Sequence, residues 1–217
     1  DLADPAAMQS LTTLAEMGMG LLLTSTGQLW LGEEGCWHQG GLRMFDVADP
    51  TAPVLVGEDI DGLRGFPHVM AEVSGHVFAA ELMCWCAGEW PALHVYRLGE
   101  QPLPTPRWTG ERGRVFDLVA HGERLHVATD AGLETWSLAD PAAPQVLQTV
   151  APDTFCWRLA AADGLLATTR TATPGDGFTL QLLGRGPDGL LEPRGQLPLS
   201  SETPADLDTD GARVIVG

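Results

Sequence analysis

Two short segments of the sequence hold side chains that could bind a metal ion or form disulfides. In each segment two such side chains flank a tryptophan, and a third segment supplies the last of the four cysteines. The segments are Cys36-Trp37-His38, Cys84-Trp85-Cys86 and Cys156-Trp157. Thiolate and imidazole groups are ligands for zinc and copper, whereas two thiols in an oxidising compartment can form a disulfide. The available chemistry depends on whether the fold brings these segments together.

A run of alternating acidic residues near the end of the chain is a candidate calcium site. The segment "DLDTDG" places Asp206, Asp208 and Asp210 before Gly211, a spacing that resembles the start of a calcium-binding loop. The acidic residue that normally ends such a loop is missing, because its position falls on Gly217. The pattern therefore favours solvated acids at a hairpin over calcium binding.

The composition narrows the classes of partner. The 217 residues carry a formal net charge of −17, and all 12 basic residues are arginines. Binding to nucleic acid requires clustered basic residues, so nucleic acid is not expected as a partner. The same charge disfavours an anionic membrane surface. No apolar run is long enough to span a bilayer.

An internal repeat of about 45 residues organises the chain. The strings "DLADPAA", "DVADPTAP" and "SLADPAAP" begin at residues 1, 46 and 137, and their shared aspartates lie 45 and 91 positions apart. Hairpin-like segments with a central glycine recur with gaps of 48, 47, 42 and 47 residues. These glycines are Gly27, Gly75, Gly122, Gly164 and Gly211. Two landmarks that keep one period indicate a repeat protein.

Each repeat is predicted to form four short antiparallel strands. Strands over Phe116–Ala120 and Arg124–Thr129 flank a tight turn in which glycine adopts a positive φ. A third strand with alternating side chains follows, and Phe45, Tyr96 and Trp136 on these third strands are expected in the core. An Ala-Asp-Pro turn then leads to an outer strand. Repeated four-stranded units predict an all-β fold, a β-propeller, whereas the strands of a β-sandwich carry no such repeat.

The repeat also predicts the domain organisation. The chain is expected to form one propeller domain over residues 1–217, with about four and a half blades of a ring that has five or more in the full protein. The expected units are residues 1–16 together with 204–217, 17–62, 63–112, 113–152 and 153–203.

The repeated motifs resemble a known family. The segments "GLRMFDVADPTAPVLVG" and "DLVAHGERLHVA" resemble LVIVD repeats of bacterial propeller proteins, most specifically over Gly41–Gly57 and Gly132–Leu147. The resemblance implies a propeller on an exported protein, which places the chain outside the cell, on its surface or in the periplasm. It implies no common activity and transfers no catalytic residues.

The repeat places the cysteines on one face of the predicted ring. Cys36 and Cys84 each lie nine residues after a hairpin glycine, in the long loops between the second and third strands of neighbouring blades. The first strands start on this face as well and add further side chains. The predicted binding face consists of Cys36, Trp37, His38, His68, Cys84, Trp85, Cys86, Cys156 and Trp157.

Three interpretations of this face remain open. The exported setting that the resemblance implies favours a loop-pinning disulfide that involves Cys84, with Cys86 paired to Cys156 or left free. The second interpretation is a zinc or copper site at Cys36, His38, Cys84 and Cys86, although structural zinc sites usually have wider spacings. The third is free thiols beside packed tryptophans. No cofactor is expected, and zinc, copper and calcium are the alternatives.

No catalytic motif is found. The sequence lacks a G-x-S-x-G elbow, a P-loop and a dinucleotide fingerprint, and His121 and His126 are expected to be solvated turn residues on the opposite face. We therefore expect a non-enzymatic binding or scaffolding module that takes a protein or carbohydrate ligand on the loop face. The alternative is a metal-dependent enzyme with a Cys/His or carboxylate site on that face.

Overall fold

The computed structural model describes residues 18–33, 41–60, 63, 66–82, 92–99, 108–111, 114–141, 143–162, 164–172, 177–199, 206–209 and 213–216. Within these ranges the chain is all-β and contains no helix. The absence of helices in the described ranges also means that no long apolar helix there could cross a membrane.

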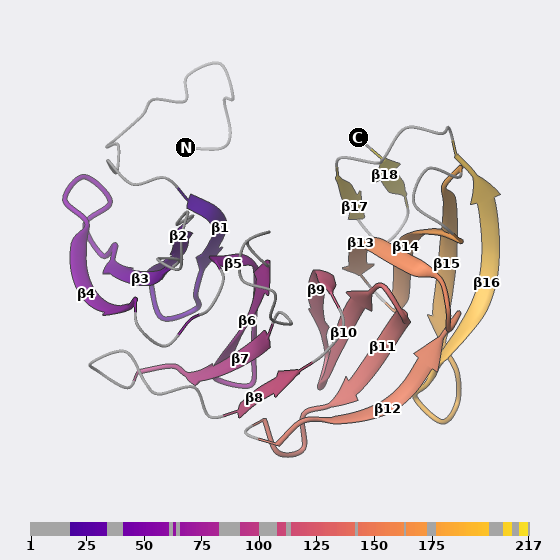
Figure 1. Cartoon of the computed structure of the whole chain (residues 1–217), viewed down its shortest axis with the longest axis horizontal. Helices are drawn as coiled ribbons and strands as arrows, with labels where there is room; N and C mark the ends of the chain where they lie inside the picture. The colour runs from indigo at the N-terminus through magenta and orange to yellow at the C-terminus, as the bar shows by residue number, and fades with distance from the viewer. Residues whose placement is uncertain are drawn as a thin grey trace.

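The strands form four four-stranded antiparallel sheets and one smaller sheet, as the propeller prediction requires (Figure 1). The first sheet contains β1 (Gly18–Leu23), β2 (Gln28–Glu33), β3 (Gly41–Asp46) and β4 (Val54–Asp59). The second contains β5 (Phe66–Val73), β6 (His76–Leu82), β7 (Ala92–Arg97) and β8 (Trp108–Glu111). The third contains β9 (Val115–His121), β10 (Arg124–Thr129), β11 (Gly132–Ser137) and β12 (Gln145–Val150). The fourth contains β13 (Phe155–Ala162), β14 (Leu165–Thr171), β15 (Thr179–Arg185) and β16 (Leu191–Pro198), and β17 (Leu207–Thr209) pairs with β18 (Val214–Val216).

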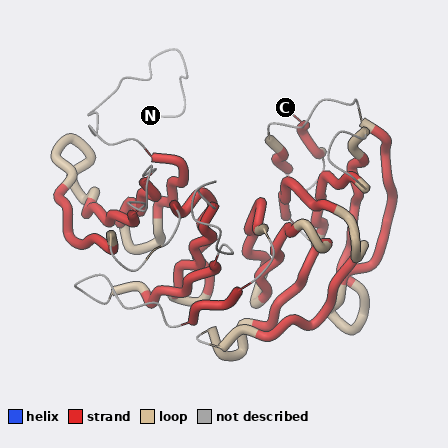
Figure 2. The backbone as a smooth tube through the Cα atoms, in the orientation of Figure 1, coloured by secondary structure: helices blue, strands red, loops and turns tan. Residues whose placement is uncertain are grey.

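The sheets are arranged around an arc with their first strands innermost. In each sheet the strands pair in chain order. The inner strands of neighbouring sheets contact each other, β1 with β5, β5 with β9, β9 with β13 and β13 with β17. The strands β4, β8, β12 and β16 lie on the outside (Figure 2). Because the strands pair in chain order, every sheet is formed by one continuous stretch of the sequence.

The hairpin glycines explain why the repeat is visible in the sequence. In the turn between β5 and β6, Ser74 and Gly75 have φ angles of 51° and 71°, and they connect the paired residues Val73 and His76. Positive φ at both central positions gives a type I′ turn, which matches the twist of the strands. The requirement for a positive φ therefore places a glycine near the same point of each sheet.

The cores lie between the sheets. Leu125, Val127 and Trp136 of the third sheet pack against Phe78 and Val95 of the second. On the other side of the same sheet, residues that include Ala128 and Leu133 pack against the fourth. The residues predicted as third-strand core residues are indeed buried: Phe45, Tyr96 and Trp136 are 6%, 0% and 0% exposed.

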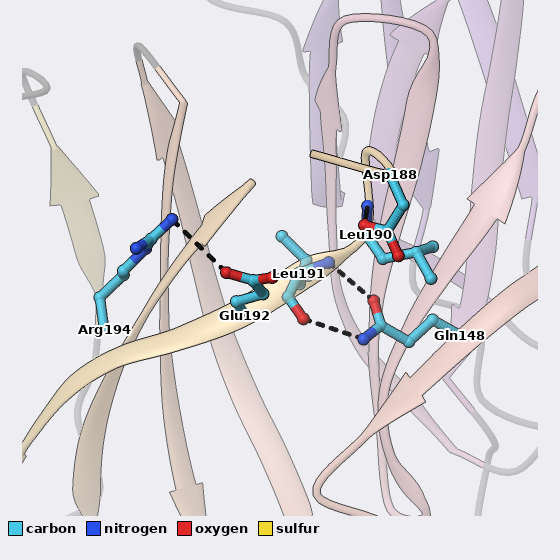
Figure 3. A network of polar contacts seen from close by, with 6 residues as sticks. All are labelled: Gln148, Asp188, Leu190, Leu191, Glu192 and Arg194. Atoms are coloured by element: carbon cyan, nitrogen blue, oxygen red, sulfur yellow. Dashed lines mark hydrogen bonds and ion pairs between the residues drawn. The ribbon is translucent and has the colours of Figure 1, made fainter. Parts of the chain in front are cut away.

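Polar side chains also connect neighbouring sheets. The side-chain amide of Gln148 on β12 donates from Nε2 to the carbonyl oxygen of Leu191 (2.9 Å), and its Oε1 accepts from the Leu191 amide (2.8 Å) (Figure 3). The outer strands of the third and fourth sheets are thus joined as if by one rung of a β-ladder. Between the first two sheets, the amide and hydroxyl groups of Ser25 donate to the carboxylate of Glu72.

The expectation for His126 was wrong. This residue is 2% exposed, because it lies inside β10, whose alternate residues face the fourth sheet. Its Nδ1 lies 3.0 Å from the hydroxyl oxygen of Thr135 on the neighbouring strand. The position of His126 two residues beyond the turn suggested solvent, but the fourth sheet covers it.

Burial between sheets predicts a large difference between two leucines. Leu125 is fully buried between the second and third sheets, and Leu197 on the outer strand β16 is 57% exposed. Leu125→Ala should lower the free energy of unfolding by about 3 kcal/mol, because it removes apolar contacts and leaves a cavity. Leu197→Ala should change it by less than about 0.5 kcal/mol. Denaturant unfolding followed by tryptophan fluorescence measures both, and equal losses would contradict this account of the core.

Candidate functional site

Three polar side chains from consecutive inner strands form the candidate site. They are His68 on β5, Asp117 on β9 and Arg158 on β13, and we call them the inner-strand cluster. Each is half-buried, so it is partly accessible to solvent. Burial has the largest effect on the pKa of His68 and of Asp117, and the positive charge of Arg158 acts on both groups as well. The sheet arrangement therefore brings together three residues that lie 41 and 49 positions apart in the sequence.

Asp117 is held in place by two backbone amides. Its Oδ1 accepts from the amide of Leu118 and its Oδ2 from the amide of Leu159 on β13, both at 2.8 Å. The pKa of Asp117 is raised to about 6, chiefly by burial and with a smaller contribution from the negative charge of Asp206, while the two amides and Arg158 oppose the shift. Each carboxylate oxygen has a second lone pair, so Asp117 can still accept a proton from a bound molecule.

The raised pKa has a defined consequence for stability. The folded protein binds the Asp117 proton more tightly than the unfolded chain does, because the folded pKa exceeds the ordinary aspartate value of 3.8. The stabilisation from this group is complete below pH 3.8 and is lost as the pH rises through about 6. At neutral pH the ionised carboxylate therefore carries a cost in folding free energy, which is a common property of groups at functional sites.

His68 lies at a bulge that first-sheet glycines accommodate. The pairing of β5 with β6 shifts between Pro67 and Val69, so His68 is the extra residue. A Cβ atom on Gly20 or Gly32 would overlap the backbone of Pro67. The two glycines therefore allow the bulge to approach the first sheet, and this approach determines where His68 lies.

The environment of His68 keeps its ring neutral. Nδ1 lies 3.0 Å from the carbonyl oxygen of Ala80, so this nitrogen carries the hydrogen and donates it. Burial lowers the pKa of His68 and Arg158 lowers it further, against the carbonyl groups of Ala80 and Val115. Nε2 is buried and forms no hydrogen bond that meets standard geometry.

Arg158 lies beside three aromatic side chains, Phe116, Trp157 and Phe178, which we call the aromatic wall. Its Nη1 donates to the carbonyl oxygen of Phe116 at 3.4 Å. The Phe116 ring stacks on Trp157 with 4.4 Å between ring centroids and 28° between planes. Trp157 is the bulged residue of β13, and its edge meets Phe178 at 6.2 Å. The cluster thus combines a carboxyl group, a guanidinium and a flat apolar surface.

A second polar pair is buried and enclosed. His94 Nε2 lies 3.0 Å from Glu81 Oε1, with side chains only 4% and 1% exposed. The ring of His94 stacks on Tyr96 at 6.2 Å, and the Tyr96 hydroxyl donates to Asp59 at 3.3 Å. A substrate has no access to so deep a pair, and we assign it to the packing of the first and second sheets.

The structure describes only part of the predicted binding face. His68, Cys156 and Trp157 lie on inner strands, whereas Cys36, Trp37, His38, Cys84, Trp85 and Cys86 lie outside the described residues. The predicted zinc or copper set therefore lies wholly outside them too. Among the described residues, no group of three or more His, Cys, Asp or Glu side chains could hold a metal ion.

The predicted pairing of Cys86 with Cys156 is not present, because Cys156 is a free, buried cysteine. Its side chain faces the core between the third and fourth sheets. Burial raises the pKa of the thiol to about 11, although hydrogen bonds with Thr168 and Thr154 oppose this. A protonated, enclosed thiol is a poor nucleophile and a poor metal ligand.

The two described members of the acidic run bond to local backbone. Asp206 accepts from the amide of Leu207 at 2.8 Å, and Asp208 accepts from the amide of Thr209 at 2.7 Å. Both are exposed. Asp210 lies outside the described residues.

Sequence reasoning missed Asp117 and Arg158. Both lie in inner strands that otherwise read as apolar, "VFDLVA" and "FCWRLA". A charged residue at such a position was the available signal, because a charge inside a buried strand is costly unless it is compensated. Their common location could not be read from the sequence, since it depends on contacts between sheets.

Two solved propeller structures are similar to this chain. Both are described as a "putative 6-phosphogluconolactonase". The protein from Bacteroides fragilis has a TM-score of 0.65 and 13% identity over 86% of this chain and 58% of its own. That from Bacteroides uniformis has a TM-score of 0.66 and 12% identity over 85% of this chain and 58% of its own. These similarities show the fold, and the chain spans 58% of the length of each structure.

One curated protein is similar in sequence. Ribonuclease TTHA0252 of Thermus thermophilus is 32% identical over 93 residues, which are 43% of this chain and 21% of the ribonuclease. No family model matches the chain. The assignment to LVIVD repeats is thereby corrected, because the similar structures are propellers of the 6-phosphogluconolactonase type. Ala-Asp-Pro turns and alternating strands follow from blade geometry, so they do not distinguish propeller families.

The expected function is corrected as well. A non-enzymatic binding or scaffolding module was predicted from the absence of catalytic motifs. The two propellers and the ribonuclease described above carry the names of enzymes, which overturns both that prediction and the expectation of no enzymatic activity. Motifs of contiguous residues do not detect a site whose members come from separate sheets.

The glycine contact predicts how His68 can be displaced. Gly32→Ala should force the Pro67–His68 bulge away from the first sheet and lower the free energy of unfolding by about 1 to 3 kcal/mol. Because burial is what lowers the pKa of His68, displacement should raise that pKa towards 6.5. NMR titration of the imidazole measures the shift. Gly195→Ala is the matched control, since a Cβ there meets nothing within 4 Å, and an unchanged His68 in Gly32→Ala would refute the role of Gly32.

Proposed function

We propose that the protein is a hydrolase that opens the ester ring of a sugar lactone at the inner-strand cluster. The observation that carries the proposal is the Asp117 carboxyl group, with its pKa raised to about 6, beside the guanidinium of Arg158. Ester hydrolysis needs a base that takes a proton from water and a positive group that stabilises the resulting oxyanion. The names of the similar propellers support a lactone as the substrate class.

Asp117 acts as the general base. A pKa of about 6 leaves its carboxylate ionised at neutral pH and close to the optimum for proton transfer. The carboxylate takes a proton from water while the water oxygen bonds to the lactone carbonyl carbon. The ring C–O bond then breaks, and the proton on Asp117 passes to the departing alkoxide. One water molecule is consumed, and a hydroxy acid is the product.

Arg158 and the aromatic wall contact the carbonyl oxygen and the sugar ring of the substrate, respectively. The guanidinium stabilises the negative charge that forms on the former carbonyl oxygen, where a fixed positive charge in a half-buried site is most effective. The exposed parts of Phe116 and Trp157 offer a flat apolar surface to the sugar ring. His68 remains neutral and contributes an uncharged wall. Every step uses side chains of this chain. The absence of a cofactor and the export of the protein both stay predictions.

The charge of the chain argues against the activity that the ribonuclease name would suggest. With a net charge of −17, the surface repels a polyanion such as RNA. A single small lactone carries at most a few charges, and one arginine can compensate for them locally. The lactone is therefore the substrate class that fits both the cluster and the overall charge.

Replacing Asp117 tests the proposal. The rate of 6-phosphogluconolactone hydrolysis above the spontaneous rate should fall about 100-fold or more in Asp117→Asn, because the base is lost. In the wild type, kcat/KM should fall tenfold per pH unit below pH 6 and level off above it. Asp117→Asn should lack this dependence. The measurement is proton release in a pH-stat.

Asp188→Asn is the control, since Asp188 lies exposed in the turn between β15 and β16, at the opposite end of the strands. It should keep the wild-type rate and pH profile, and thermal melts should show all variants folded. Wild-type protein that leaves the spontaneous rate unchanged, or Asp117→Asn with the wild-type rate, would refute the proposal.

A further inference from the structure

A group of basic residues lies at the end of the strands opposite to the inner-strand cluster, between the third and fourth sheets. His121 ends β9, Arg124 and His126 lie near the start of β10, and Arg185 ends β15. We call these four residues the basic junction. The proposed lactone site does not use these four residues.

The alternation of β10 directs two of the four towards the fourth sheet. Leu125 and Val127 pack against the second sheet, whereas Ala128 packs against the fourth. Successive side chains of a strand point to opposite faces, so Arg124 and His126 share the face of Ala128. Arg124 also pairs directly with His121 across the hairpin.

The two arginines cross the junction in opposite directions. Nη2 of Arg185 reaches back to the third sheet, where it donates to the carbonyl oxygen of His121 at 3.5 Å. It lies 3.4 Å from the position of a Cβ on Gly122. Nη2 of Arg124 reaches forward to within 3.9 Å of the equivalent position on Gly189, in the turn between β15 and β16. The imidazole of His121 in turn accepts from the amide of Gly164 on the fourth sheet at 3.4 Å.

The positive charges at the junction are not neutralised within the described chain. Neither Arg124 nor Arg185 forms an ion pair with a described residue. The acids of the bordering turns are Glu123 and Asp188, and Asp188 accepts from the amide of Leu190 at 3.0 Å (Figure 3). Two arginines without a described acidic partner at one junction between sheets are unexpected in a chain of net charge −17.

The pKa of the buried His126 reflects this excess of positive charge. Burial and, to a lesser extent, the charges of His121, Arg185 and Arg124 together lower the pKa of His126 to about 4. No acidic group among the described residues is found to raise it. Nε2 of His126 is buried without a hydrogen-bond partner. This buried nitrogen and the guanidinium groups of Arg124 and Arg185, which form no ion pair with a described residue, make the junction a place where an anion would be stabilised.

We propose that the basic junction binds a phosphate group, either free phosphate or a small phosphate monoester, through Arg124 and Arg185 with His121 beside them. Guanidinium groups donate two parallel hydrogen bonds to phosphate oxygens, which suits an anion held between two arginines. Because the arginines come from different sheets, the bound anion links the third sheet to the fourth. This site is separate from the lactone site and does not depend on it.

Titration calorimetry with inorganic phosphate at constant ionic strength tests the site. The wild type should show saturable binding of one phosphate, and Arg124→Gln and Arg185→Gln should each weaken it about tenfold, the effect of losing one charged hydrogen-bonding group. Arg194→Gln is the matched control, because Arg194 is exposed on β16 and pairs with Glu192 at 3.7 Å (Figure 3). This control should bind phosphate as the wild type does.

Two further measurements distinguish the kinds of ligand and separate this proposal from the lactonase proposal. Glycerol 3-phosphate that binds more tightly than inorganic phosphate would identify a monoester as the ligand, and the reverse order would identify the free anion. Asp117→Asn should retain phosphate binding, so failure of the lactonase proposal leaves this one standing. Absence of saturable binding by the wild type, or equal affinity in Arg124→Gln, Arg185→Gln and Arg194→Gln, would overturn the inference.

Discussion

Burial of the middle strands on both faces is the constraint on which the rest of this structure depends. In β10, residues from Leu125 to Thr129 are buried without interruption, because one set of side chains packs on the second sheet and the other on the fourth. A sheet with two apolar faces cannot be stable alone in water. Each sheet is therefore stabilised by its neighbours, and inner strands far apart in the sequence must lie side by side.

The same stacking creates a need for polar groups at the ends of the strands. Gln148 forms a backbone-like pair of hydrogen bonds between two outer strands. Asp117 forms a single hydrogen bond between two inner strands, with the amide of Leu159. The carboxylate of Asp117 is partly desolvated in this role, which is why its pKa is raised. A residue that joins two sheets thus also has an acidity that suits the general base we propose, and its ionised form lowers the stability of the fold.

The two ends of the strands have different electrostatics. At one end the inner strands bring a carboxyl group, a neutral imidazole and a guanidinium together, while at the other end the turns of the third and fourth sheets collect Arg124, Arg185 and two histidines. Both groups lie where sheets meet, because only there do side chains from separate repeats come within reach of each other. Rigid sheets hold these side chains in fixed positions, so the chemistry depends on the residues at their junctions.

The sequence by itself determined the four-stranded repeat, the glycine turns and the third-strand core at Phe45, Tyr96 and Trp136, because each follows from local alternation and backbone sterics. His68 and Trp157 could be placed on inner strands for the same reason. The burial of His126, the free state of Cys156 and the meeting of Asp117 with Arg158 were decided only by the tertiary structure. These properties arise from contacts between sheets, whose side chains are separated by about one repeat, and no local pattern encodes which of them will face each other.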